Sequence, residues 1–244
     1  MTKSIWYLIK FFKEEDHADN FRKGNLYLNR LSYFKKKDES PEDVRSDLHE
    51  ALSHHWQPDD LIIELNFPGT GINKITKSDL AGPVTVGLEL FNNLHIFCMY
   101  AVHTDGFDLT DGKINYSIED AEKLKNQLKI DERCFNFGSY AVVVPAVPFI
   151  EMVKRSLEAA KWPSKLKLVN YIDSATYHGS IKNEDSPFTK LDKFSYQNEY
   201  RICINTGTSG DDPLNINIGD IQDISAIARS IQLNDLFKIN SIEI

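Results

Sequence analysis

The sequence is poor in cysteine, and its apolar residues never form a long unbroken run. Of its 244 residues only three are cysteines, Cys98, Cys134 and Cys203. An odd and widely spaced set argues against a disulfide framework or a structural zinc site and fits a reducing compartment. No apolar run approaches the roughly 20 residues that span a bilayer, and the first residues do not resemble a signal peptide. We therefore expect a cytoplasmic protein with no membrane partner.

The sequence is also short of positive charge, with 28 basic against 36 acidic residues and a net charge of -8. A chain with this balance does not coat nucleic acid through bulk electrostatic attraction, although a local basic groove is compatible with it. It lacks internal repeats and any linker rich in proline, glycine and serine, so we expect a single domain over residues 1–244. It also lacks the glycine-rich phosphate loops and the G-x-S-x-G turn, which argues against P-loop, Rossmann and serine-hydrolase enzymes.

Hydrophobic periodicity and β-branched or aromatic residues predict the strands and helices. We expect strands over residues 4–12, 25–29, 61–67, 94–103, 140–144, 166–172, 194–205, 214–218 and 241–244. We expect helices over residues 16–23, 42–55, 118–128, 149–160 and 221–230, and a loop over residues 68–82. Strands and helices that do not alternate regularly are typical of an α+β domain built on antiparallel sheets.

The most informative segment is the predicted strand over residues 194–205 (FSYQNEYRICIN). Alternate side chains of a strand share a face, so its apolar side chains face the core while Gln197, Glu199 and Arg201 line a polar cleft. A carboxylate that binds a ribose hydroxyl stabilises an oxocarbenium-like transition state, and a polar group two residues earlier can orient the nucleophile. Glu199 and Gln197 have the residue types and the spacing for these two roles. The same pattern also describes the solvated face of an edge strand.

Around this motif the sequence resembles the ADP-ribosyltransferase superfamily, in which a Gln/Glu-x-Glu motif follows an irregular turn, here residues 179–193. The resemblance implies split mixed and antiparallel β-sheets flanked by helices, with NAD bound in the cleft between the sheets. It also implies that Glu199 is the catalytic carboxylate and that Gln197 helps to select the acceptor.

The start of the chain carries the same resemblance, because Trp6–Phe11 and Gly24–Leu28 look like the first nicotinamide-binding segments of the superfamily. This implies that Tyr7 or Tyr27 stacks on the nicotinamide ring. The cations that the resemblance suggests for the NAD pyrophosphate are Lys10, Arg45 and Arg201, the last of which could instead hold Glu199 in its rotamer. The sequence departs from the superfamily where the opening strand has neither Arg nor His. It departs again where residues 98–100 are Cys-Met-Tyr instead of Ser-Thr-Ser.

Two longer blocks, Gly24–Asp47 and Lys193–Arg201, are similar to ADP-ribosyltransferase-like toxins of bacterial phage defence, one of which modifies RNA. The resemblance implies an NAD-dependent mono-ADP-ribosyltransferase that releases nicotinamide and modifies a macromolecule, with RNA or DNA slightly favoured over protein. A cognate antitoxin is a further candidate partner. Two alternatives stay open: an NAD glycohydrolase that uses water as the acceptor, and a non-catalytic binding or inhibitor module with the same fold.

Two polar clusters give weaker signals. Lys35–Lys37, beside Tyr33 and Phe34, would suit phosphate contacts and base stacking on a nucleic-acid acceptor, or only a solvated charge run next to core aromatics. Glu50 and His54 lie four residues apart on the helix predicted over residues 42–55 and could share a metal ion used in hydrolysis. A third ligand is not evident in the sequence. A solvated helix face explains these two residues better, and we expect no metal.

Overall fold

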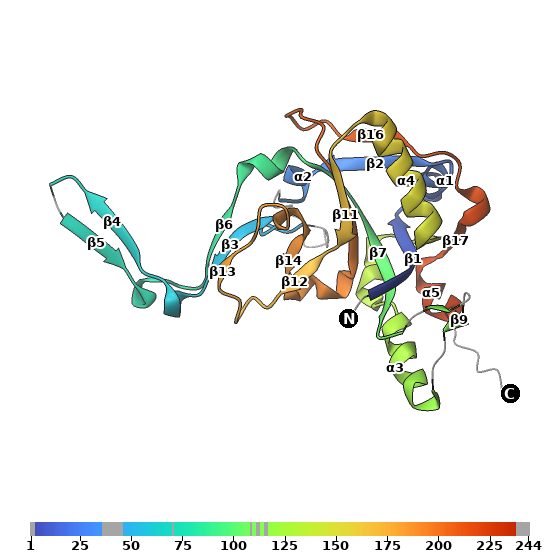
Figure 1. Ribbon diagram of the computed structural model, residues 1–244, viewed down its shortest axis with the longest axis horizontal. Coiled ribbons are helices and arrows are strands. Elements are labelled where there is room, and N and C mark those ends of the chain that lie inside the picture. The colour runs from blue at the N-terminus through green and yellow to red at the C-terminus, as the bar shows by residue number, and fades with distance from the viewer. Residues whose placement is uncertain are drawn as a thin grey trace.

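The computed structural model describes residues 3–35, 46–69, 71–107, 109–110, 113–114 and 117–237, and it shows an α+β protein with mostly antiparallel strand pairs, as the sequence predicted (Figure 1). Its strands are β1 (Lys3–Phe12), β2 (Asn25–Arg30), β3 (Leu52–Trp56), β4 (Ile63–Phe67), β5 (Gly71–Ile75), β6 (Val84–Gly87), β7 (His95–Asp105), β8 (Leu109–Thr110), β9 (Lys113–Ile114), β10 (Tyr140–Pro145), β11 (Ser164–Leu168), β12 (Asn170–Ile172), β13 (Gly179–Ser180), β14 (Thr189–Leu191), β15 (Glu199–Ile204), β16 (Leu214–Asn217) and β17 (Ala226–Arg229). Its α-helices are α1 (Glu15–Arg22), α2 (Leu31–Lys35), α3 (Ile118–Leu128), α4 (Ala146–Ala160) and α5 (Leu233–Leu236). Among the described helices, none combines the length and the apolar character that crossing a bilayer requires.

An eight-stranded sheet organises the body of the molecule, with the strand order β11-β15-β7-β1-β10-β17 and with β2 and β16 joined to it through β7. The long apolar strand β7 lies near the middle of this sheet, and along one of its edges the partner strand changes from β1 to β2. It pairs with β1 as far as Ile9 opposite Tyr100, and with β2 at Asn29 opposite Ile96. Between these two pairings Lys10 Nζ donates to the carbonyl oxygen of Cys98 at 2.7 Å. The sheet therefore opens between β1 and β2.

One face of this sheet packs against helices α1 and α4 and forms the largest apolar core. Helix α4 presents Phe149, Val153 and Leu157 at intervals of four residues, so one stripe of the helix is fully buried. Burying each such side chain contributes about 1.5–3 kcal/mol. The opposite face carries Ile9 and Tyr100, which belong to a second, smaller core and also border a cavity. This second face supplies the wall of the candidate site.

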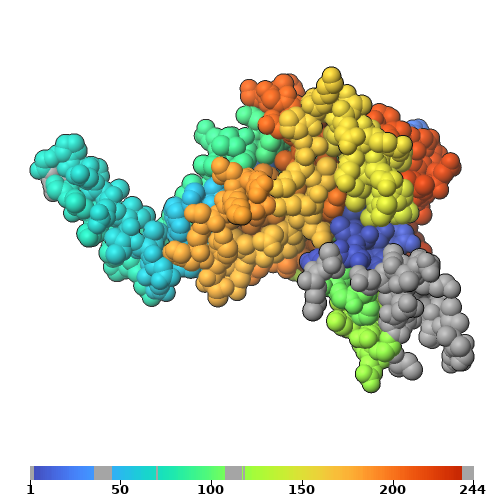
Figure 2. All heavy atoms as spheres, in the orientation of Figure 1, coloured from blue at the N-terminus to red at the C-terminus, as the bar shows by residue number. Residues whose placement is uncertain are grey.

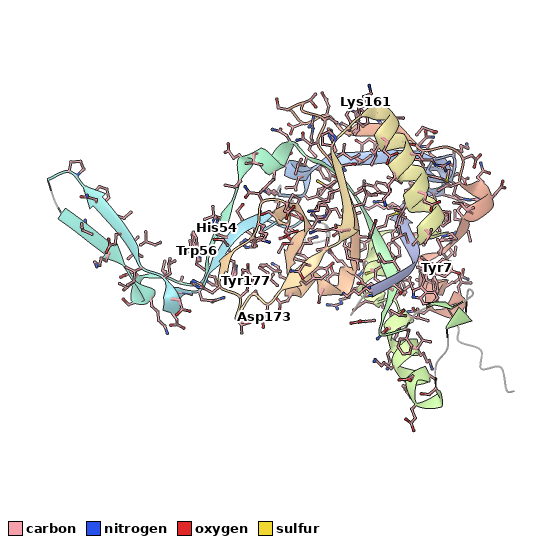
Figure 3. The ribbon with its side chains drawn as sticks, in the orientation of Figure 1. Tyr7, His54, Trp56, Lys161, Asp173 and Tyr177 are labelled. Atoms are coloured by element: carbon pink, nitrogen blue, oxygen red, sulfur yellow. The ribbon has the colours of Figure 1, made fainter. Side chains whose placement is uncertain are left out.

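Beyond β15, shorter strands form a smaller layer that leads to a projecting hairpin. Strand β3 pairs with β6 and β13, and β12 pairs with β14 in parallel. The hairpin β4–β5 and its flanking turns, residues 58–69 and 71–82, form what we call the arm, which stands clear of the body (Figures 1 and 2). The arm carries exposed apolar side chains, Leu65 and Phe67 on one face, beside the ion pair Glu64–Lys74 at 2.8 Å. Figure 3 places His54, Trp56 and Tyr177 at its root.

Two predicted helices are wrong in the part of the chain that the structure describes. Of the helix expected over residues 42–55, residues 42–45 lie outside the described residues, and residues 48–51 form a turn that ends at Ala51, whose φ is +56°. Residues 52–56 then form β3, because pairing with β6 and β13 overrides local helix preference. In the helix expected over residues 221–230, only residues 222–224 form a short 3-10 helix, and residues 226–229 form β17, which pairs with β10.

Three predicted extended or loop segments also need correction. The loop expected over residues 68–82 contains β5, because Gly69 and Gly71 adopt positive φ and close a hairpin. The strand expected over residues 166–172 is divided into β11 and β12. The strand expected over residues 194–205 begins only at Glu199, because residues 192–197 form a 3-10 helix. The strand expected over residues 241–244 lies outside the described residues.

Candidate functional site

A cavity of about 150 Å³ lies against the open face of the central sheet, where β1 gives way to β2. Its apolar wall comes from β1, α2, β7 and residue 137 and consists of Ile9, Phe11, Phe34, Ile96, Met99, Tyr100 and Phe137. Its polar wall consists of Lys10, Asn29, Glu50, Lys190, Gln197, Glu199 and Arg201. A cavity of this size accommodates one six-membered ring. The site therefore offers a single ring both aromatic contacts and a charged edge.

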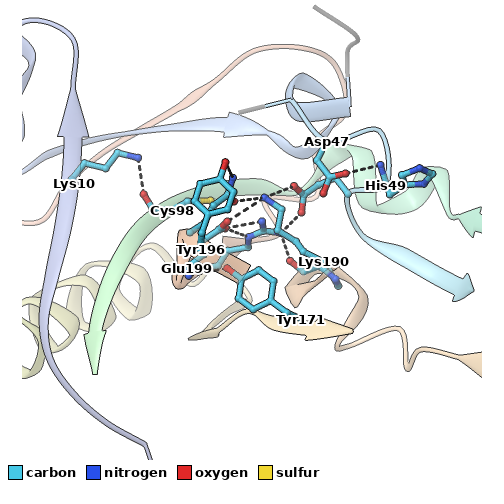
Figure 4. A network of polar contacts seen from close by, with 12 residues as sticks. Lys10, Asp47, His49, Cys98, Tyr171, Lys190, Tyr196 and Glu199 are labelled. Atoms are coloured by element: carbon cyan, nitrogen blue, oxygen red, sulfur yellow. Dashed lines mark hydrogen bonds and ion pairs between the residues drawn. The ribbon is translucent and has the colours of Figure 1, made fainter. Parts of the chain in front are cut away.

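Four buried charged side chains on the polar wall form a closed network, which we call the charge ring (Figure 4). Arg201 contacts Glu199 Oε1 at 2.7 Å and Glu50 Oε1 at 2.6 Å. Lys190 Nζ contacts Glu199 Oε2 at 3.3 Å and Glu50 Oε2 at 3.4 Å. Each carboxylate thus uses one oxygen for each cation, and the ring of two acids and two bases is electrically neutral.

The contacts within the ring shift the pKa values of Glu199, Lys190 and Arg201 in the direction that favours the charged form of each. Burial raises the pKa of Glu199, but Arg201 and Lys190 outweigh this effect and hold the pKa well below its ordinary value. Burial lowers the pKa of Lys190, but the carboxylates of Glu199 and Glu50 outweigh it and hold the pKa above its ordinary value. The pKa of Arg201 is raised in the same way against its burial. Removing one partner of such a network leaves a buried charge uncompensated.

A tight turn brings Gln197 and Glu199 into the same cavity. The 3-10 helix over residues 192–197 ends at Asn198, whose φ of +40° lies in the left-handed region that Asn tolerates better than most residues. The Asn198 side chain donates to the carbonyl oxygen of Ala101 at 2.7 Å and accepts from His103 Nε2 at 2.7 Å, so the turn is fixed to β7. The predicted shared face thus arises from a turn and not from strand alternation, which corrects the expectation for Gln197.

The structure brings together five of the seven residues that the sequence suggested for the site. Gln197, Glu199, Arg201, Lys10 and Tyr27 line the cavity, and Tyr27 is 55% exposed at its mouth. Of the other two, Tyr7 does not line the cavity, and Arg45 lies outside the described residues. The ring of Tyr7 packs edge-on against Phe237 at a centroid distance of 5.5 Å.

Sequence reasoning missed two members of the charge ring, Glu50 and Lys190. Glu50 was assigned to a solvated helix face, whereas it is buried in the turn before β3. Lys190 lay in a stretch interpreted only as an irregular turn, although it belongs to β14 and is also buried. Glu50 reaches Arg201 and Lys190 from a segment far away in the chain. Lys190 is only nine residues from Glu199, but neither Glu50 nor Lys190 has a local pattern that would reveal its place in the ring.

The weaker polar clusters also have definite places. Tyr33 and Phe34 lie at the cavity, in an edge-on pair with centroids 5.4 Å apart, while Lys35 donates to Asn92 Oδ1 at 2.9 Å. Residues 36 and 37 lie outside the described residues. The His54 ring packs against Trp56, and no group of three metal-ligating side chains occurs in the described part of the chain.

Two further groups border the charge ring. Burial raises the pKa of the Cys98 thiol to about 12, so this cavity-lining residue stays protonated and is a poor nucleophile. Burial, followed by the charge of Glu50, raises the pKa of Asp47. Asp47 accepts from the His49 amide at 2.9 Å through one oxygen, and its other oxygen has no hydrogen-bond partner among the described residues.

Comparison with known proteins identifies no relative of this chain. No protein-family model, no curated protein and no solved structure matches the chain. The function must therefore be inferred from the chemistry of the cavity and from the motif that lines it.

Proposed function

We propose that the protein is an NAD-dependent mono-ADP-ribosyltransferase, which releases nicotinamide and transfers ADP-ribose to a macromolecule. The observation that carries the proposal is the placement of Gln197 and Glu199 side by side in a cavity with an aromatic wall. The resemblance of the motif to the superfamily adds to it. The opening of the sheet between β1 and β2 supports the finer proposal of an ADP-ribosyltransferase-like split sheet.

The reaction breaks the bond between the ribose anomeric carbon and the nicotinamide nitrogen. The electron pair of this bond leaves with nicotinamide, positive charge develops on the ribose, and the acceptor then forms a bond to the anomeric carbon and loses its proton. In the proposed role, the ionised Glu199 accepts a hydrogen bond from a ribose hydroxyl, and this bond strengthens as the charge develops. Arg201 and Lys190 hold the carboxylate in place before the substrate arrives.

The dimensions of the cavity suit the nicotinamide end of NAD. Its volume of about 150 Å³ is enough for one ring, and Phe34 and Tyr100 supply aromatic contacts. The rest of the dinucleotide would pass over the exposed side chains of Tyr27 and Tyr33 at the mouth. Lys10 places a positive charge at the opening of the sheet, as a pyrophosphate requires.

A non-catalytic binding module is the second candidate, and one observation favours it. Both oxygens of Glu199 are already engaged by cations, so a structural role would account for the same contacts. Hydrolysis of NAD by water uses the same residues as transfer and differs only in the acceptor.

Incubation of the purified protein with NAD radiolabelled in its adenylate phosphate and a bacterial extract tests the proposal. We expect nicotinamide release, measured by liquid chromatography, and label in the RNA, DNA or protein fraction. Glu199→Gln should abolish release. The matched control Glu184→Gln removes an exposed carboxylate that pairs with Lys165 and should keep it. Intact NAD after incubation with the folded wild-type protein contradicts the proposal, and nicotinamide release without labelled macromolecule indicates a glycohydrolase.

A further inference from the structure

The charge ring has one contact outside itself that bears on the acceptor. Lys190 Nζ donates to Gln197 Oε1 at 2.9 Å. The lysine comes from β14 and the glutamine from the end of the 3-10 helix over residues 192–197, and both side chains are buried. This contact joins the ring to Gln197, which lines the cavity.

The contact determines which end of the Gln197 amide is offered to the cavity. An ammonium group has only donors, so the amide must direct its oxygen toward Lys190. The amide nitrogen then lies at the other end, where the hydroxyl of Tyr196 is 3.5 Å away, at the long limit of a hydrogen bond. Gln197 is therefore presented as a hydrogen-bond donor. Without a fixed partner, an amide can turn over and present its oxygen, because its two ends have nearly the same size.

Lys190 is itself held firmly. Its three N–H donors have three oxygen partners within 3.4 Å, one each from Gln197, Glu199 and Glu50. Since the two carboxylates are fixed by Arg201 on their other oxygens, the position of the ammonium follows from the whole ring. The orientation of the Gln197 amide is thus coupled to the residue that we propose acts on the ribose.

We propose that Lys190 is a positioning residue that makes Gln197 a hydrogen-bond donor and thereby selects acceptors with a lone pair beside the attacking atom. A carbonyl oxygen or an unprotonated ring nitrogen meets this requirement, whereas a group with only N–H donors does not. The inference rests on the proposed function, because it concerns the acceptor of the transfer.

A double-mutant cycle tests the contact without any use of NAD. Lys190→Met, Gln197→Leu and the double variant are compared with the wild type by urea unfolding. We expect the two changes to be coupled by about tenfold or more in the unfolding equilibrium constant, since hydrogen bonds to charged groups are among the stronger ones. Additive effects would show that the amide is not held by Lys190 and would overturn the proposal.

The partition ratio, defined as labelled macromolecule formed per nicotinamide released, tests the selection. Lys190→Met frees the amide, and Gln197→Glu keeps the contact to Lys190 but offers an oxygen to the acceptor. With radiolabelled NAD and bacterial extract, we expect both variants to lower the partition ratio by at least tenfold. A merely structural role would lower release and transfer together and leave the ratio unchanged, which would overturn the selection.

The two measurements separate the two proposals. Strong coupling in the folded protein, together with no nicotinamide release by the wild type, contradicts the proposed function and the acceptor role that rests on it. Nicotinamide release by the wild type with an unchanged partition ratio contradicts only the role of Lys190. A lowered ratio in both variants, with strong coupling, supports both.

Discussion

The charge ring allows the chemical role of Glu199 to be separated from its structural role. Glu199→Gln keeps the shape of the side chain but leaves Lys190 and Arg201 opposite Glu50 alone. An uncompensated buried charge costs about 3–5 kcal/mol. For a chain of this length each kcal/mol lowers Tm by about 2–4 °C, so we expect a decrease of about 6–20 °C.

A second change should restore the charge balance. Adding Lys190→Met to Glu199→Gln leaves one cation and one anion, Arg201 and Glu50, in direct contact. We expect the double variant to recover at least half of the lost stability, measured by thermal unfolding followed by circular dichroism.

Activity should not recover with stability. Neither variant retains the carboxylate that the proposed mechanism needs, so nicotinamide release should be lost in both. A double variant that releases nicotinamide at the wild-type rate would refute the role of Glu199, and a double variant less stable than Glu199→Gln would refute the ring as a coupled unit.

Of three further predictions, one concerns the acid beside the ring and two concern the arm. The folded-state pKa of Asp47 is raised above its ordinary value of 3.8, so the stability this group contributes is present below that value and is lost as the pH rises. Asp47→Asn should therefore be more stable than the wild type in urea unfolding at pH 7, with the difference shrinking toward pH 4; a constant difference would contradict this. Replacing residues 61–80 of the arm with a short glycine-serine linker should change the free energy of unfolding by less than about 1 kcal/mol, because a lone hairpin is only marginally stable. Hydrogen exchange should be faster in β4 and β5 than in β7, and equal protection would count against an independent arm.

Much of the fold could be predicted because burial leaves a periodic pattern in the sequence. The strands β1, β7 and β10 and the helix α4 lie close to their predicted ranges, since their apolar side chains face a core. The segments that form β3 and β17 have no such pattern. Their conformation is set by pairing with strands distant in the chain, which local reasoning does not include.

The site could be predicted only in part for the same reason. Gln197, Glu199 and Arg201 are close in sequence, so their types and spacing placed them together, although the turn at Asn198 was not foreseen. Glu50 reaches the site from a distant segment, and Lys190, although only seven residues from Gln197, reaches it from β14 across the intervening 3-10 helix. A buried charge network is specified by three-dimensional proximity, and a single sequence contains no local sign of it.

The arm also affects how the molecular mass of this protein should be measured in solution. A compact chain of 244 residues has a radius of gyration of about 18 Å, and a hairpin standing clear of the body makes the value larger. Such a particle experiences more friction and leaves a gel-filtration column earlier than a sphere of 28.0 kDa. A monomer would then elute like a heavier species, so the number of subunits should be taken from light scattering or sedimentation equilibrium.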